Sequence, residues 1–184
     1  MLAEWAPALL VLGVPPALAV RIAQKQPARL LTLAPVALGI WLVTYYIWHI
    51  PAAYDAALER PALLHLEHAC YLAAGVLLWW PVFQDAPYRL SNAARAVYLF
   101  AAFVLASPIG LLLALLPEPA YDWYGEAGGF WGLTPHADQQ LAGVAMSVEQ
   151  AVVFFAVFAL FFFRFLAEEE TGPSPAEKMG RSAY

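Results

Sequence analysis

Charged side chains are scarce in this sequence. Asp, Glu, Lys and Arg make up only 12% of the 184 residues, whereas 62% are hydrophobic. A soluble domain carries about 25% charged residues. The mean hydropathy is +0.63. This balance excludes an ordinary soluble domain and predicts an integral membrane protein that is surrounded by the lipid bilayer.

Paired cysteines and clustered positive charge are also missing. Cys70 is the only cysteine, so an internal disulfide is excluded, and a lone cysteine in an apolar segment is typical of a small buried residue. The formal net charge is −5 and no basic cluster stands behind it. Nucleic acid is therefore not expected as a partner.

Five apolar segments are long enough to cross a bilayer, which takes about 20 residues of helix. We place them at about residues 6–22, 30–50, 63–83, 93–116 and 136–166. The predicted fold class is therefore all-α, an integral membrane bundle of about five transmembrane helices that forms a single domain over residues 1–166. The first segment lacks a basic leader, so we interpret it as a retained helix and not as a signal peptide. Residues 167–184 are polar and contain Pro and Gly, which predicts a disordered tail.

The distribution of positive charge predicts the orientation of this bundle. If five helices alternate in direction, every Lys and Arg except Arg60 lies on one side of the membrane. Lys and Arg concentrate on the cytoplasmic side. We therefore expect a multi-pass protein of the inner (plasma) membrane with its N-terminus outside and its C-terminus in the cytoplasm.

All four histidines fall at the outer end of this predicted bundle. His49 ends the second span, His65 and His68 begin the third, and His136 begins the fifth. Histidines three residues apart share one face of a helix, so we expect His65 and His68 to point together towards His49, with Glu67 facing away. Neutral imidazole suits copper, zinc and haem iron. The pattern predicts a metal site, although histidine also suits the headgroup zone of a membrane without any ligand.

The last span is too polar to face only lipid. Its first half contains Asp138, Gln139, Gln140, Ser147, Glu149 and Gln150. Asp138 offers an oxygen and Met146 a thioether, which suits Cu(I). Glu149 lies about 16 Å of helical rise beyond Asp138, near the middle of the membrane. An ionisable group at that depth is either functional or a protonated group bonded to a neighbouring helix. Gly143 and Ser147, four residues apart, predict close helix packing.

Two stretches of the sequence together resemble a known family. "WHIPAAYDAALERPALLHLEHACYLAAGVLLWWPV" and "WGLTPHADQQLAGVAM" are similar to the CtaG family of cytochrome c oxidase (caa-type) assembly factors. These are bacterial membrane proteins linked to the maturation of haem-copper oxidases and to copper delivery. The similarity covers about residues 7–166. It implies that five residues occupy motif positions: His49, His65, His68, Asp138 and Gln139.

The sequence departs from the family pattern at its start. Family members usually begin with another membrane segment that carries two histidines four residues apart, just before the part that matches "APALLVLGVPP". The sequence here starts at "MLAEW" and has no such pair. The resemblance thus implies either a shortened relative or a translation start that lies further upstream.

The residues and the resemblance together predict an accessory protein that helps to assemble cytochrome c oxidase, with oxidase subunits as partners and no catalytic activity of its own. Copper is the expected cofactor, held on the extracytoplasmic face. The predicted metal ligands are His49, His65, His68 and Asp138, and the additional candidates are His136, Gln139, Met146 and Glu149.

Two alternatives stay open at this point. A haem-binding membrane electron carrier would use His49 and His68 as axial ligands on facing helices. A small transporter or channel would be built around Glu149. The second alternative is less favoured because the sequence has no pair of broken helices in repeated halves.

Overall fold

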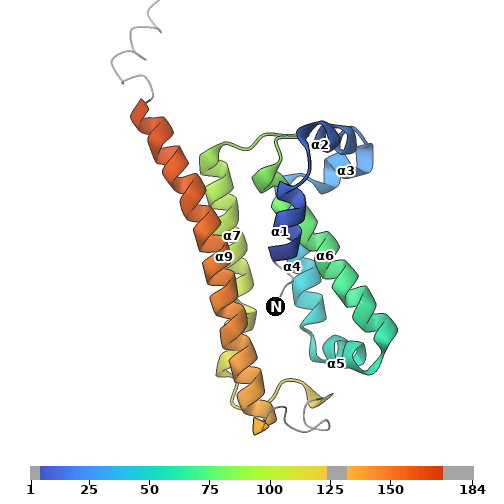
Figure 1. Ribbon diagram of the computed structural model, residues 1–184. Helices are drawn as coiled ribbons and strands as arrows, with labels where there is room; N and C mark the ends of the chain where they lie inside the picture. The colour runs from blue at the N-terminus through green and yellow to red at the C-terminus, as the bar shows by residue number, and fades with distance from the viewer. Residues whose placement is uncertain (1–4, 124–131, 172–184) are drawn as a thin grey trace, which may run out of the picture.

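The protein is an all-α bundle in the computed structural model, which describes residues 5–123 and 132–171 (Figure 1). The described part contains α1 (Trp5–Leu12), α2 (Pro16–Ala23), α3 (Gln26–Leu31), α4 (Ala34–Trp48), α5 (Pro51–Glu59), α6 (Pro61–Phe83), α7 (Asn92–Leu115) and α9 (Pro135–Thr171). Three helices, α6, α7 and α9, are long and apolar enough to cross a membrane. Up to five spans result if the bent pairs α1–α2 and α4–α5 each count as one. The predicted fold class is therefore confirmed.

The three long helices agree with the predicted spans to within a few residues at most of their ends. The exception is the end of α9, which continues to Thr171, so residues 167–171 are helical where the sequence predicts disorder. Ala and Glu, which fill most of this extension, are strong helix formers. The rest of the predicted tail, residues 172–184, lies outside the described residues.

The first two predicted spans are bent. α1 and α2 meet at 101°, and α4 and α5 meet at 72°. Pro15 and Pro16 follow the first bend directly, and Pro51 follows the second. Proline lacks a backbone N–H and disfavours helix in the residue before it, yet it fits the first turn of the next helix. Each bend is therefore a proline-led restart of the helix in a new direction.

The two ends of the bundle carry different side chains, and Figure 1 shows which helices lie at each end. α2, α3, the connection from α6 to α7 and the end of α9 lie at one end, which we call the cationic end because it holds every described Lys and Arg except Arg60. α5, the start of α6, the end of α7 and the start of α9 lie at the other. We call it the histidine end, since all four histidines belong to it. The separation predicted from the sequence is present in the fold.

α7 and α9 form the closest helix pair, and glycine allows it. A Cβ atom on Gly143 would stand 2.5 Å from the backbone N of Ala114 and 2.7 Å from the backbone O of Gly110. A Cβ atom on Gly110 would stand 2.5 Å from Oγ of Ser147. The two backbones therefore touch where any larger residue would separate them, which confirms the close packing predicted from Gly143 and Ser147.

Aromatic rings join this pair to the layer of α4 and α6. The Phe154 ring of α9 lies 5.8 Å from the Trp41 ring of α4 and 5.4 Å from the Trp79 ring of α6, measured between centroids. The hydroxyl of Tyr98 on α7 donates to the carbonyl of Leu78 on α6 at 2.9 Å. These buried contacts fix α4 against α9, and the cavity described next lies between those two helices and α7.

Candidate functional site

A cavity of about 60 Å³ lies at the histidine end, between α4, α7 and α9. Its wall includes four of the residues singled out in the sequence: His49, Asp138, Gln139 and Met146. The remaining lining residues are Tyr54, Leu113, Tyr121 and Ala142. The fold therefore brings an imidazole, a carboxylate and a thioether to one small space, although His49 and Asp138 are far apart in the chain.

His49 ends α4, and its hydrogen bonds assign its tautomer. Nδ1 lies 2.7 Å from the carbonyl oxygen of Tyr45. A carbonyl can only accept, so Nδ1 carries the proton and the lone pair is on Nε2. The Tyr71 hydroxyl lies 3.2 Å from the same Nδ1, and the Tyr45 ring packs on the imidazole at 4.6 Å between centroids. In a neutral imidazole this arrangement leaves the Nε2 lone pair available to a metal ion.

Two tyrosines form the outer wall of the cavity. The rings of Tyr54 on α5 and Tyr121 after α7 are stacked with centroids 4.1 Å apart, and the Tyr121 hydroxyl donates to the carbonyl of His49 at 3.5 Å. The Asp55 carboxylate accepts from the backbone N–H of Asp122 at 3.3 Å. Together these contacts clamp the segment after α7 onto α5 and close the cavity on that side.

The first turns of α9 bring in the other side of the cavity. Asp138, Ala142 and Met146 are spaced four residues apart and share one face of the helix. Gln139 is only 5% exposed, and its amide is fully used. Its Oε1 accepts from the backbone N–H of Ala120, and its Nε2 donates to the carbonyl of Leu113 at 3.2 Å. Gln139 therefore ties α9 to the end of α7, and Asp138 and Met146 are the side chains left for a ligand.

α6 places its histidines differently from the prediction. His65 and His68 are exposed, whereas Glu67, expected to face away from these two histidines, is 7% exposed. The inward face of α6 consists of Glu67, Tyr71, Ala74 and Leu78, which recur every three or four residues, and Tyr71 is the member that contacts His49. The exposure of His65 and His68 shows that both lie off this stripe.

The predicted group of three histidines is consequently not assembled. Within residues 5–123 and 132–171, no group of three or more His, Cys, Asp or Glu side chains is arranged to hold a metal ion. His136 bonds through Nε2 to the carbonyl of Leu116 at 2.9 Å, which links the start of α9 to the end of α7. Cys70 is a half-buried free thiol.

Glu149 lies one turn beyond the cavity on α9. Its Oε1 is buried and has no hydrogen-bond partner among the described residues. The neighbouring Gln150 is 2% exposed, and its Nε2 donates to the Tyr45 hydroxyl at 2.8 Å. One of the polar residues predicted in the middle of α9, Gln150, therefore contacts α4 through Tyr45, and Tyr45 in turn contacts His49.

A match to one family model establishes the protein family of this chain. The family model described as cytochrome c oxidase caa3 assembly factor (Caa3_CtaG) matches residues 1–168. The chain belongs to this family. No curated protein and no solved structure matches it. The Caa3_CtaG relationship confirms the resemblance stated from the "WHIPAAYD", "HLEH" and "ADQQLAG" segments, and it connects this membrane protein with the assembly of cytochrome c oxidase.

Sequence reasoning missed the aromatic part of the Caa3_CtaG site. Tyr45, Tyr54, Tyr71 and Tyr121 all contact His49 or form the cavity wall. A signal for one of them was available, because Tyr71 lies four residues beyond Glu67 and seven before Leu78, on one face of a helix. No comparable pattern marks Tyr121, which lies beyond the end of α7 and stacks on Tyr54 of α5.

Proposed function

We propose that this Caa3_CtaG protein assists the assembly of a caa3-type oxidase by holding a copper ion for a short time in the cavity beside His49. The supporting observation is the convergence of His49, Asp138 and Met146 on one 60 Å³ space. Copper is here a cargo that is received and passed on, so the role is ligand exchange and not catalysis.

The donor set suits a loosely held copper ion. Imidazole binds both oxidation states of copper, and a thioether favours Cu(I). His49 offers its Nε2 lone pair because Nδ1 is committed to Tyr45. Among the described residues, the cavity offers one imidazole, one carboxylate and one thioether, fewer than the closed set of four ligands that makes structural metal sites permanent. An incomplete set leaves room for a ligand from the partner that takes the ion.

The size of the cavity favours an ion over a haem. A water-sized occupant needs about 10–15 Å³, whereas organic ligands occupy pockets of about 300 Å³ or more. The cavity measures about 60 Å³. A haem between His49 and His68, the alternative function, has less support because His68 is exposed at the surface. The transporter alternative rests on Glu149, which does not line this cavity.

The charge distribution supports an extracytoplasmic location for the cavity. Lys and Arg concentrate on the cytoplasmic side of membrane proteins, and the described cations other than Arg60 lie at the end opposite the cavity (Figure 1). In this orientation the cavity lies at the side of the membrane where the copper centres of an oxidase are loaded. The partners would be oxidase subunits in the plasma membrane.

Complementation of a cell that lacks the protein tests this function. The readout is the spectrum and activity of the caa3-type oxidase. His49→Gln should lower oxidase maturation while the level of the variant stays normal, and added copper should restore part of it. The matched control, His65→Gln with His68→Gln, changes two exposed histidines at the same end and should mature the oxidase normally. Normal maturation with His49→Gln would contradict a role for the cavity, and failure that copper does not relieve would favour assembly without copper handling.

A further inference from the structure

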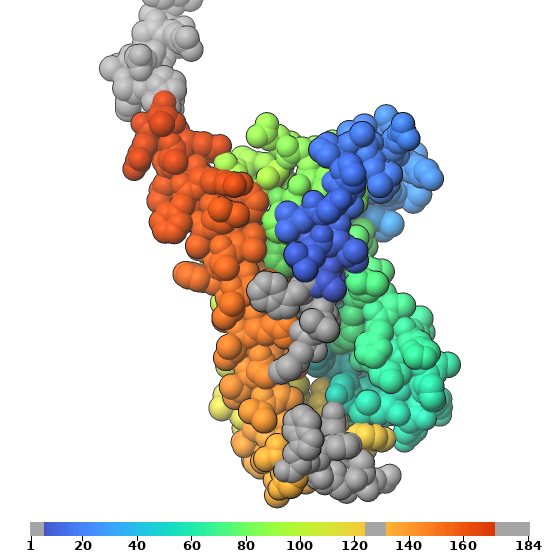
Figure 2. Space-filling view, in the orientation of Figure 1, coloured from blue at the N-terminus to red at the C-terminus, as the bar shows by residue number. Residues whose placement is uncertain are grey.

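The segment from Pro16 to Leu31, which contains α2 and α3, forms an elbow at the cationic end. α2 turns away from α1 by 101°, and Figure 2 shows the blue elbow standing at the surface of the molecule at that end. α2 has eight residues and α3 has six, so each is about 12 Å long or shorter. Neither helix crosses a bilayer of about 30 Å, and an end position places both at the level of the headgroups.

The elbow carries all the charge of residues 5–54. From Trp5 to Tyr54 the sequence contains no Asp or Glu, and its only charged residues are Arg21, Lys25 and Arg29. Arg21 and Lys25 are exposed and form no ion pair with any residue that the structure describes. The positive charge of the elbow therefore lacks a counter-charge of its own.

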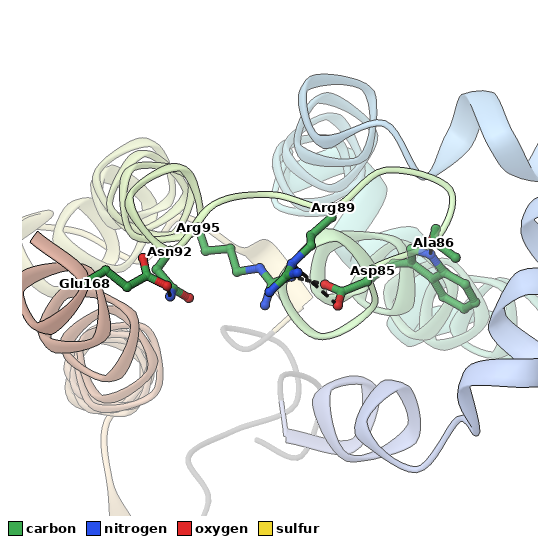
Figure 3. A network of polar contacts seen from close by, with 7 residues as sticks. Asp85, Ala86, Arg89, Asn92, Arg95 and Glu168 are labelled. Carbon is green, nitrogen blue, oxygen red and sulfur yellow. Dashed lines mark hydrogen bonds and ion pairs between the residues drawn. The ribbon is translucent and has the colours of Figure 1, made fainter. Parts of the chain in front are cut away.

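Two acids of the cationic end, Asp85 and Glu168, already have partners. Asp85 pairs with Arg89 and Arg95, and the Asn92 amide donates to Glu168 at 2.7 Å, as Figure 3 shows. Arg29 is held by Tyr88, whose hydroxyl accepts from Nε at 2.9 Å. Glu168 lies on α9, which Figure 1 shows on the far side of the bundle from the elbow. Among the residues that the structure describes, no acid therefore pairs with Arg21 or Lys25.

Apolar side chains flank these cations. Leu18 is 47% exposed and Leu30 is 58% exposed, although both are among the side chains that water disfavours most. Short helices that combine exposed leucine with Lys and Arg, and that lie across the bundle axis, have the composition of interfacial anchors. The apolar groups enter the acyl boundary while the cations remain among the phosphates.

We propose that the elbow is a binding surface for anionic phospholipid headgroups. The leucines contact the acyl chains, and Arg21 and Lys25 contact the phosphate and the negative headgroup. A lipid is favoured over a free phosphate ion because the exposed leucines flank the same cations, and a soluble anion would leave them in water. This surface is independent of the copper cavity, which lies at the other end of the bundle.

Lipid binding by the full chain tests the proposal. Purified protein in a neutral detergent is titrated with phosphatidylglycerol or phosphatidylcholine, and bound lipid is counted by native mass spectrometry. Arg21→Gln with Lys25→Gln should weaken phosphatidylglycerol binding by about fivefold for each cation, a typical value for one basic residue at an anionic surface. Arg60→Gln at the opposite end is the matched control and should change nothing. Equal affinity in the double variant, or an equal loss in the control, would overturn the proposal.

Two further arms separate the alternatives. Inorganic phosphate at millimolar concentration should not displace the lipid; displacement would assign the cations to a soluble anion. In phosphatidylglycerol nanodiscs, a nitroxide at position 30 (Leu30→Cys with Cys70→Ser) should be relaxed more by oxygen than by a polar nickel complex. The opposite order would place the elbow in water and contradict membrane contact, whatever the stability of the double variant.

Discussion

Gly143→Ala tests the contact that holds the cavity helices together. The added Cβ atom would meet the backbone N of Ala114 at 2.5 Å, the backbone O of Gly110 at 2.7 Å and the backbone C of Leu113 at 3.0 Å. Backbone atoms cannot swing aside, so α7 and α9 must move apart. Overpacking of this kind costs about 1–3 kcal/mol, and we place this site at the upper end. Alanine favours the helix by about 1 kcal/mol relative to glycine, so the expected net loss of unfolding free energy is about 2 kcal/mol.

The measurement is the free energy of unfolding in detergent micelles, compared with a matched glycine. A Cβ atom on Gly39 in α4 meets nothing within 4 Å, so Gly39→Ala should gain about 0.5–1 kcal/mol. The separation caused by Gly143→Ala should also loosen the bond between Gln139 and Leu113, which both line the cavity. If Gly143→Ala is as stable as Gly39→Ala, the close α7–α9 contact is not what organises this site.

Three further experiments test the role of Gln139, the role of Glu149 and the orientation in the membrane. Gln139→Leu should cost about 1–3 kcal/mol of unfolding free energy because it leaves buried backbone groups unpaired; Gln140→Leu, whose side chain makes no hydrogen bond with the described residues, should cost much less, and equal losses would refute this assignment. Glu149→Gln should impair oxidase maturation at normal protein levels, since glutamine keeps the shape but cannot ionise; normal maturation would retire Glu149 as a functional residue. A reporter active only outside the cytoplasm should work after Arg60 and be silent after Arg89, and the reverse pattern would place the cavity in the cytoplasm.

The long helices could be predicted from the sequence because their signal is additive. α6, α7 and α9 each contain a continuous apolar run, and such a run has few other structures available in a membrane. The bends at Pro15 and Pro51 could not be predicted in the same way. Hydropathy sums apolar character along the chain and carries no direction, so a helix that restarts at 101° has the same sum as a straight one.

The candidate site was predictable in part. His49, Asp138 and Met146 line one cavity. Polar side chains near the ends of apolar helices tend to face the interior of the bundle, because lipid disfavours them. The spacing of His65 and His68 does not predict which side of α6 turns towards the bundle. Burial of Glu67 with Tyr71 turns α6 by tertiary packing, and charged residues are rarely buried unless other contacts require it.

Copper binding by purified protein is the sharpest test of the proposed copper site beside His49. One Cu(I) per chain should bind with a sulfur and an imidazole nitrogen visible by X-ray absorption, and the affinity should fall as the solution is acidified, since protonated imidazole has no lone pair to donate. His49→Gln should abolish this binding, and Met146→Leu should remove the sulfur signal. His65→Gln with His68→Gln should bind as the unchanged protein does. Copper that persists in His49→Gln, or that is lost only in the His65 and His68 double variant, would contradict the cavity as the copper site.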